Sequence, residues 1–185
     1  AERRGVTITT IIAKREDNGT VTLGWDSQST GATTHHVEKV ACVNDQFHIG
    51  VAGRTRYGNL LKFIDVPALH TADIETGNYD AFEYLITQVI PSWIGALDKQ
   101  FGLIPDQKDD WPDGVALIVL QGRIFEVCHD FTVVEAARDF EGIGSGSAYA
   151  LGAIASGKSV KKALEIAAEL DLWTGGTLRV QKGLK

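Results

Sequence analysis

The sequence predicts an α+β fold in which antiparallel sheets built from hairpins are layered with helices. Three pairs of strand-like segments are each joined by a short turn, which is typical of antiparallel pairing. Helical segments are grouped between these pairs instead of alternating singly with strands, so a parallel sheet is not expected. The chain has 185 residues, 44% of them hydrophobic, which is enough for one substantial core.

The predicted strands follow from β-branched composition and from the turns between them. The three pairs are 7–15 with 20–25, KVACVND with FHIGVAG, and the two halves of GVALIVLQGRIFEVCHD. Their turns contain Asn18-Gly19, Asn44-Asp45 and Gln121-Gly122, residue types that tolerate positive φ. A last short strand is predicted near residues 177–181.

Apolar spacing near the helical period marks four further segments. They are RYGNLLKFI at 56–64, the long stretch 79–101, and the pair 148–156 and 160–170. Pro91 inside the long stretch predicts a kink or a break, because proline lacks a backbone N–H. Residues 65–79 carry Pro67, Gly77 and scattered polar residues and are predicted to form a loop.

Charge and hydropathy exclude several function classes. A formal net charge of -6 disfavours nucleic acid as a partner, because phosphate binding needs a basic surface. No stretch approaches the roughly 20 apolar residues of a membrane span, and no secretory signal pattern follows AERRGV. Cys42 and Cys128 do not make a disulfide framework. The sequence predicts a reduced, cytoplasmic protein with no membrane partner.

Three local patterns have unremarkable explanations that outweigh the chemical ones. GIGSGS at 142–147 lacks the lysine of a phosphate loop, so tight backbone packing before a helix is the better interpretation. His35 and His36 with Glu38 have no evident fourth metal ligand, and adjacent side chains on an extended chain point to opposite faces. Cys42 lies inside an apolar strand and is predicted to be a small buried hydrophobe.

Six ordered segments together are more specific than any one of them. TTIIAKRE, GWDSQST, VEKV, VAGRT, GIGSGSAYALGAIASG and LDLWTGG occur in the order and approximate spacing of proteasome β-type subunits and the bacterial HslV peptidase. The chain resembles that branch of the N-terminal nucleophile hydrolases over nearly all of residues 9–182. The resemblance implies a four-layer α-β-β-α sandwich of two antiparallel sheets with helices on both outer faces.

The resemblance also implies a set of site residues and no metal or organic cofactor. Thr9 matches the N-terminal nucleophile, Asp26 and Lys39 the charged pair beside it, and Gly53 the oxyanion donor. The second polar group is matched by Ser145, Asp171 and Thr174, where Thr174 replaces the serine more usual in proteasomes. Val51 matches the floor of the pocket for the substrate side chain, and a medium apolar floor suggests small-to-medium hydrophobic residues.

Two registers are open for the nucleophile. Matching TTI to the family's TTI selects Thr9, whereas counting back from Asp26 without a gap selects Thr10. We favour Thr9, because it preserves the family's side-chain alternation and a hairpin tip absorbs an insertion easily. Residues 1–8 then form a propeptide-like extension ahead of a single domain at 9–185. Ile8 precedes Thr9, where family members often have glycine.

The chemistry of this set can be stated without the family. A threonine hydroxyl needs a base, and an α-amino group with a reference pKa of about 7.7–8.0 can serve as one. A nearby lysine would favour the neutral amine, and a carboxylate would compensate the buried charge. Backbone N–H groups would stabilise the oxyanion. While residues 1–8 remain attached, the nitrogen of Thr9 is an amide and cannot act as the base.

Three functions remain open at this point. The first is a self-compartmentalising threonine endopeptidase, in which stacked hexameric or heptameric rings enclose the sites and an AAA+ ATPase supplies unfolded polypeptides. The second is a non-catalytic, ring-forming structural subunit that retains its propeptide. The third, with less support, is hydrolysis of small amides by an enzyme outside the proteasome branch. Retention of the threonine, aspartate and lysine together favours the first.

Overall fold

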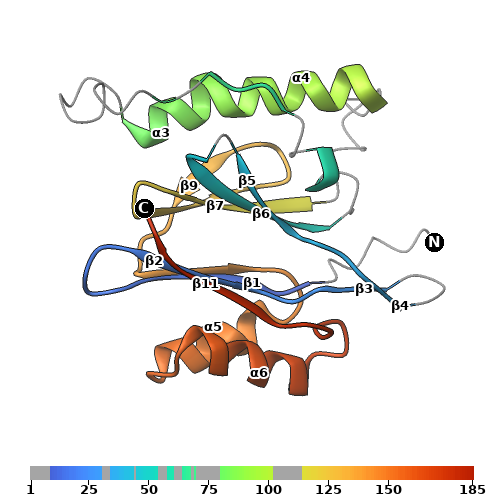
Figure 1. The fold of residues 1–185 in the computed structure, drawn as a ribbon, viewed down its shortest axis with the longest axis vertical. Coiled ribbons are helices and arrows are strands. Elements are labelled where there is room, and N and C mark those ends of the chain that lie inside the picture. The colour runs from blue at the N-terminus through green and yellow to red at the C-terminus, as the bar shows by residue number, and fades with distance from the viewer. Residues whose placement is uncertain are drawn as a thin grey trace.

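The structure, a computed structural model, describes residues 9–30, 34–43, 45–53, 58–60, 64–67, 69, 80–101 and 114–185. Its elements stack in four layers, with helices outermost and two sheets between them (Figure 1). Helices α3 and α4 cover the sheet that contains β5 to β9, and α5 and α6 cover the sheet that contains β1, β2 and β11. This is the predicted α-β-β-α sandwich.

Both sheets are antiparallel. The first has the order β10-β1-β2-β11, the second has the order β5-β6-β7-β8-β9, and β3 pairs with β4 separately. The strands are β1 (Ile11–Arg15), β2 (Val21–Trp25), β3 (Gln28–Thr30), β4 (Thr34–His36), β5 (Val40–Val43), β6 (Phe47–Gly53), β7 (Gly114–Leu120), β8 (Arg123–Val127), β9 (Val133–Glu135), β10 (Phe140–Ile143) and β11 (Arg179–Leu184). The helices are α3 (Ala81–Tyr84), η1 (Leu85–Val89), α4 (Ile90–Phe101), α5 (Ser147–Ala155) and α6 (Val160–Leu170).

All three predicted hairpins are confirmed. Strands β1 and β2, β5 and β6, and β7 and β8 pair antiparallel as neighbours in the chain. Gly19, Asp45, Gln121 and Gly122 adopt positive φ in the turns. At the first turn the side chain of Asn18 accepts from the backbone N–H of Thr20, which closes a local loop.

The core is divided among the three gaps between the layers. Ile11, Ala13 and Leu23 lie in the gap between the two sheets, together with Ala52 and Leu117 of the second sheet. The gap beneath α5 and α6 contains Ile12 and residues of both helices, and the gap beneath α4 is filled by alternate residues of β6 and β7. Alternation along β1 therefore sends its odd-numbered residues toward the second sheet and its even-numbered residues toward the helices.

The long predicted helix neither breaks nor stays regular. An α-turn, a five-residue π-helical segment (η1) and α4 follow one another from Ala81 to Phe101. Pro91 is the second residue of α4, directly after the π segment. Because proline offers no N–H and its ring crowds the carbonyl four residues earlier, the wider π turn accommodates it without a break.

Other predictions hold with shifts or fall outside the described residues. Helices α5 and α6 match 148–156 and 160–170 closely, and the last strand begins two residues later than predicted and runs to Leu184. The pair β3–β4 and strands β9 and β10 were not predicted, because they are short and carry polar residues. Most of the predicted helix at 56–64 and the loop at 65–79 lie outside the described residues, as does 1–8.

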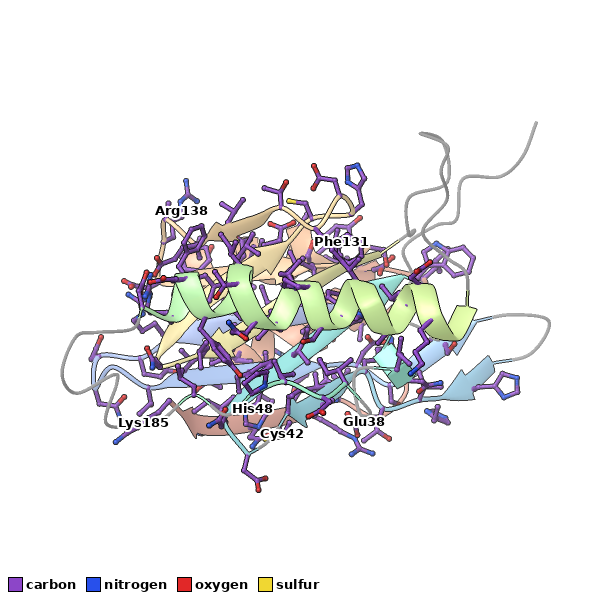
Figure 2. All side chains as sticks on the ribbon, turned by 90° about the horizontal axis from the view of Figure 1, so that it is seen from above. Glu38, Cys42, His48, Phe131, Arg138 and Lys185 are labelled. Carbon is purple, nitrogen blue, oxygen red and sulfur yellow. The ribbon has the colours of Figure 1, made fainter. Side chains whose placement is uncertain are left out.

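The prediction for Cys42 is wrong. Cys42 lies on β5, at the edge of the second sheet, and its side chain is exposed. It pairs with His48 across the β5–β6 hairpin, and Figure 2 shows the two residues on the same side of the long helix. An edge strand has only one neighbour to cover it, so an apolar sequence context did not ensure burial here. Both cysteines are free thiols.

Candidate active site

A buried ion pair lies at the end of the sandwich where β1 begins. Asp26 follows β2 directly, and Lys39 directly precedes β5. Lys39 Nζ lies 2.8 Å from Asp26 Oδ1, and the two side chains are 5% and 0% exposed. The sequence prediction that these two residues meet is confirmed, and a pair buried this far from water interacts more strongly than a surface pair.

Asp26 is held by backbone donors as well as by the lysine. Its Oδ1 accepts from the backbone N–H of Thr10 at 2.9 Å. Its Oδ2 accepts from the N–H groups of Gln28 and Gly175, each at 3.1 Å. Four donors thus converge on one carboxylate, which fixes its orientation.

The environment of Lys39 opposes its charge. Burial lowers the pKa of its ammonium below the ordinary 10.5, and the neighbouring Asp26 carboxylate offsets part of that shift. The N–H of Val51 on β6 donates to the carbonyl of Lys39 at 3.1 Å, which ties the backbone at Lys39 to the second sheet.

A second polar group gathers around Asp171, which directly follows α6. Ser145 Oγ lies 2.7 Å and Thr174 Oγ1 2.6 Å from the same oxygen, Oδ2. These residues are 26 and 3 positions from Asp171 in the chain, and the sequence reasoning grouped all three correctly. Ser145 also lies 3.5 Å from the backbone nitrogen of Thr9, so the second group reaches the start of β1.

The two threonines before β1 point in different directions. The side chain of Thr10 faces the helix side, because its Oγ1 lies 2.6 Å from Thr174 Oγ1. Ile11, the next residue, packs against Gly50 of the second sheet. Alternation therefore directs Thr9, like Ile11, toward the space between the two sheets. Both threonines are buried.

The glycines of GIGSGS serve close packing, as predicted. A Cβ on Gly144 would overlap the carbonyl oxygen of Thr9, and Gly144 also has a φ of 97°. A Cβ on Gly146 would lie 2.5 Å from Thr174 Oγ1 and would overlap the hydroxyl of Thr10. The loop before α5 can approach both threonines only because these positions lack side chains.

Gly53 and Val51 lie on β6 near this end of the molecule. Gly53 is the last residue of β6, pairs with Gly114 and has a φ of 126°, a conformation that side chains rarely adopt. Val51 is buried and lines a small pocket between the second sheet and α4. The other residues that line this pocket are Trp93, Leu97, Gly114, Cys128, His129 and Phe131.

Some residues of the site were not singled out from the sequence. The sequence reasoning treated Thr10 only as an alternative nucleophile, yet its backbone binds Asp26 and its hydroxyl binds Thr174. Gly175, which donates to Asp26, was not identified as a site residue either. In the sequence, the only indications of these two residues are the second threonine of TTI and the glycines of LDLWTGG.

The metal interpretation of the histidines receives no support. His36 Nδ1 lies 2.9 Å from the hydroxyl of Ser27, which also accepts from the N–H of Thr177. Within the described ranges, no group of three or more His, Cys, Asp or Glu side chains could hold a metal ion.

None of the helices described is long and apolar enough to cross a membrane.

The arrangement brings the backbone nitrogen of Thr9 within 3.5 Å of Ser145, which binds the Asp171 carboxylate, while the next residue, Thr10, binds Asp26 of the charged pair. The charged pair can stabilise negative charge on an oxygen nearby, and the Ser145 hydroxyl can bind the nitrogen. Together these features suit the activation of a hydroxyl group as a nucleophile.

Comparison with solved structures finds the same fold in proteins of low sequence identity. A Thiobacillus denitrificans protein called BPH matches with a TM-score of 0.72 and 22% identity over 96% of this chain and 99% of that one. Its complex with epoxomicin matches with a TM-score of 0.70 and 21% identity over 96% and 100%. Eukaryotic HslV from Trypanosoma brucei matches with a TM-score of 0.63 and 20% identity over 94% and 98%.

The sequence itself gives no such match. No protein-family model matches the chain, and no curated protein does at a significant level. The likeness therefore rests on structure, and it extends over almost the whole length of both proteins in each comparison. The chain thus has the fold of HslV and of the Thiobacillus denitrificans protein, a four-layer α-β-β-α sandwich.

Proposed function

We propose that the chain is a threonine endopeptidase subunit that hydrolyses peptide bonds with Thr9 as its N-terminal nucleophile, once residues 1–8 have been removed. The observation that carries the proposal is the buried 2.8 Å pair of Lys39 and Asp26 at the start of β1. Burying two charges costs free energy, so a pair placed beside a threonine on the inner face of a sheet calls for a reason beyond stability.

Each residue of the pair has a role in generating the nucleophile. The free α-amine of Thr9 would take the hydroxyl proton as general base. The Lys39 ammonium would favour the neutral amine and stabilise alkoxide character on the Thr9 oxygen. Asp26 would hold the lysine, since its other contacts are all backbone N–H groups.

The remaining residues would act on the substrate and on the amine. Attack on a peptide carbonyl gives a tetrahedral oxyanion, which the N–H of Gly53 would bind, and collapse gives an ester that water hydrolyses. Ser145, held by Asp171 beside Thr174, would accept a hydrogen bond from the amine. Val51 would floor the pocket for the residue before the scissile bond, with a preference for small-to-medium apolar side chains.

The setting of the activity is part of the proposal. Copies of the chain would assemble into stacked hexameric or heptameric rings that enclose the sites, in the cytoplasm. An AAA+ ATPase would feed unfolded polypeptides to them. The likeness to HslV supports this expectation at the level of the fold.

The direct test compares chains with different first residues. A chain prepared to begin at Thr9 should hydrolyse fluorogenic peptides, whereas the same chain with Thr9→Ala, or one that begins at Thr10, should not. Epoxomicin, which the Thiobacillus denitrificans protein binds, should raise the melting temperature of the chain that begins at Thr9 and not that of Thr9→Ala.

Two results would contradict the proposal. Undiminished hydrolysis by Thr9→Ala would exclude Thr9 as the nucleophile, and activity confined to the chain that begins at Thr10 would assign that role to Thr10. An assembled but inactive ring from every version would favour the non-catalytic structural subunit.

A further inference from the structure

Thr10 is the residue through which the two polar groups of the site meet. Its backbone N–H donates to Asp26 Oδ1, and its carbonyl accepts from the N–H of Asp26 at 3.2 Å. Its hydroxyl lies 2.6 Å from Thr174, which belongs to the Asp171 group. Among the contacts described, Thr10 alone is hydrogen-bonded to both groups.

The direction of these hydrogen bonds can be worked out from the carboxylate. An ionised carboxylate only accepts, so Thr174 and Ser145 both donate to Asp171 Oδ2. The hydroxyl proton of Thr174 is then used in its hydrogen bond to Asp171. The Thr10 hydroxyl must therefore donate to the oxygen of Thr174 in the short contact between them. Three hydroxyl groups are thus ordered by one acceptor.

The same argument orients Ser145 toward the nucleophile. Ser145 has one proton to give, and Asp171 at 2.7 Å is a far better acceptor than the carbonyl of Thr9 at 3.4 Å. Its lone pair therefore faces the nitrogen of Thr9, 3.5 Å away. A chain of hydrogen bonds leads from Thr10 through Thr174, Asp171 and Ser145 to Thr9.

We infer that Thr10 is a positioning residue for the reaction, whose hydroxyl sets how strongly Ser145 attracts the amine of Thr9. This inference rests on the proposed function. Without the Thr10 donor, Thr174 stabilises the Asp171 carboxylate less, and Asp171 draws the Ser145 proton more strongly. Ser145 then becomes a better acceptor, which favours the protonated amine and raises its pKa.

The test uses chains that begin at Thr9 and carry Thr10→Val or Thr10→Ser. Thr10→Val keeps the shape of the side chain and removes the hydroxyl, and Thr10→Ser keeps the hydroxyl. The pKa of the Thr9 amine is measured from the pH dependence of its acylation by a small reagent, read by mass spectrometry of the N-terminal peptide. This readout does not require peptidase activity. The acid limb of kcat is measured in parallel.

Thr10→Val should raise the amine pKa and the acid limb of kcat together by roughly 0.3 to 1 pH unit, the size that corresponds to one net hydrogen bond. Below the amine pKa it should lower kcat roughly twofold to tenfold with little change in KM, and Thr10→Ser should restore both readouts. Thr22→Val is the matched control, because Thr22 is a buried strand threonine in β2 that lies outside the site. It should leave the amine pKa unchanged.

A folded Thr10→Val chain with an unchanged amine pKa would overturn the inference, and so would a shift of equal size in Thr22→Val. Failure of the proposed function is separable from this outcome. If Thr9→Ala hydrolyses peptides as well as the parent, the proposed function is wrong, while the amine titration still decides whether Thr10 acts on the amine of Thr9.

Discussion

Asp26→Asn should destabilise the protein by an amount that depends on pH, and the dependence identifies the cause. The substitution keeps the shape of the side chain and removes the charge that compensates Lys39, which is almost fully buried. Breaking a buried pair by removing one partner typically costs about 3 to 5 kcal/mol, because the other charge is left uncompensated.

The lysine can limit this cost by losing its proton. At pH 7, deprotonating a lysine with the ordinary pKa of 10.5 requires about 5 kcal/mol, at about 1.4 kcal/mol per pH unit. At pH 9 the same deprotonation requires only about 2 kcal/mol, so the loss of stability in the variant cannot exceed about that amount. In the variant, the unfolded state then binds one more proton than the folded state, so the stability of the variant relative to the parent should rise as the pH rises.

The assay is urea unfolding of the parent and of Asp26→Asn at pH 7, 8 and 9. Glu135→Gln is the control, because it removes one of the two carboxylate partners of Arg123 in a partly exposed ion pair, and an arginine cannot lose its proton in this range. Its effect should be small and constant with pH. If the cost of Asp26→Asn is also constant from pH 7 to 9, Lys39 is not the buried charge that the geometry indicates.

Two further predictions concern packing and pH. Gly146→Ala should destabilise the protein by about 1 to 3 kcal/mol and should lower kcat at least as much as Thr10→Val, because its Cβ would force Thr10 and Thr174 apart. Gly152→Ala, at an exposed position of α5 where a Cβ meets nothing within 4 Å, should stabilise by about 0.5 to 1 kcal/mol, and thermal unfolding compares the two. Burial lowers the pKa of His48 below 6.5, so the stability present above pH 6.5 should decline as the pH falls through the folded-state pKa. His48→Gln should flatten that decline in denaturant titrations from pH 7 to 5, and an equally steep decline in the variant would assign the effect to another group.

The hairpins and the last two helices were predictable because their signals are local. Asn18-Gly19 and Gln121-Gly122 occur between apolar, β-branched segments, and each pair specifies its turn without help from the rest of the chain. Strand β10, by contrast, contains Glu141 and Gly142 and exists because β1 pairs with it. A strand fixed by a distant partner leaves little trace in its own residues.

The candidate site likewise has a part that the sequence predicts and a part that depends on contacts between distant residues. The pairing of Asp26 with Lys39 was expected from the resemblance to the proteasome branch, and the geometry confirms that they meet. The part played by Thr10 could not be foreseen, because it depends on which face of β1 each threonine occupies and on a contact with Thr174, 164 residues away. The exposure of Cys42 depends likewise on the position of β5 at the edge of its sheet.

The long chain separation within the hydrogen-bonded network has a consequence for the timing of synthesis. Thr10 is synthesised 164 residues before Thr174, which its hydroxyl contacts, and Thr9 is synthesised 136 residues before Ser145. A growing polypeptide therefore carries both threonines through this interval of translation without the groups that orient them. Strand β1 must also wait for β10 and β11 before its sheet is complete. The order of the residues thus delays assembly of the site until Thr174 has been made.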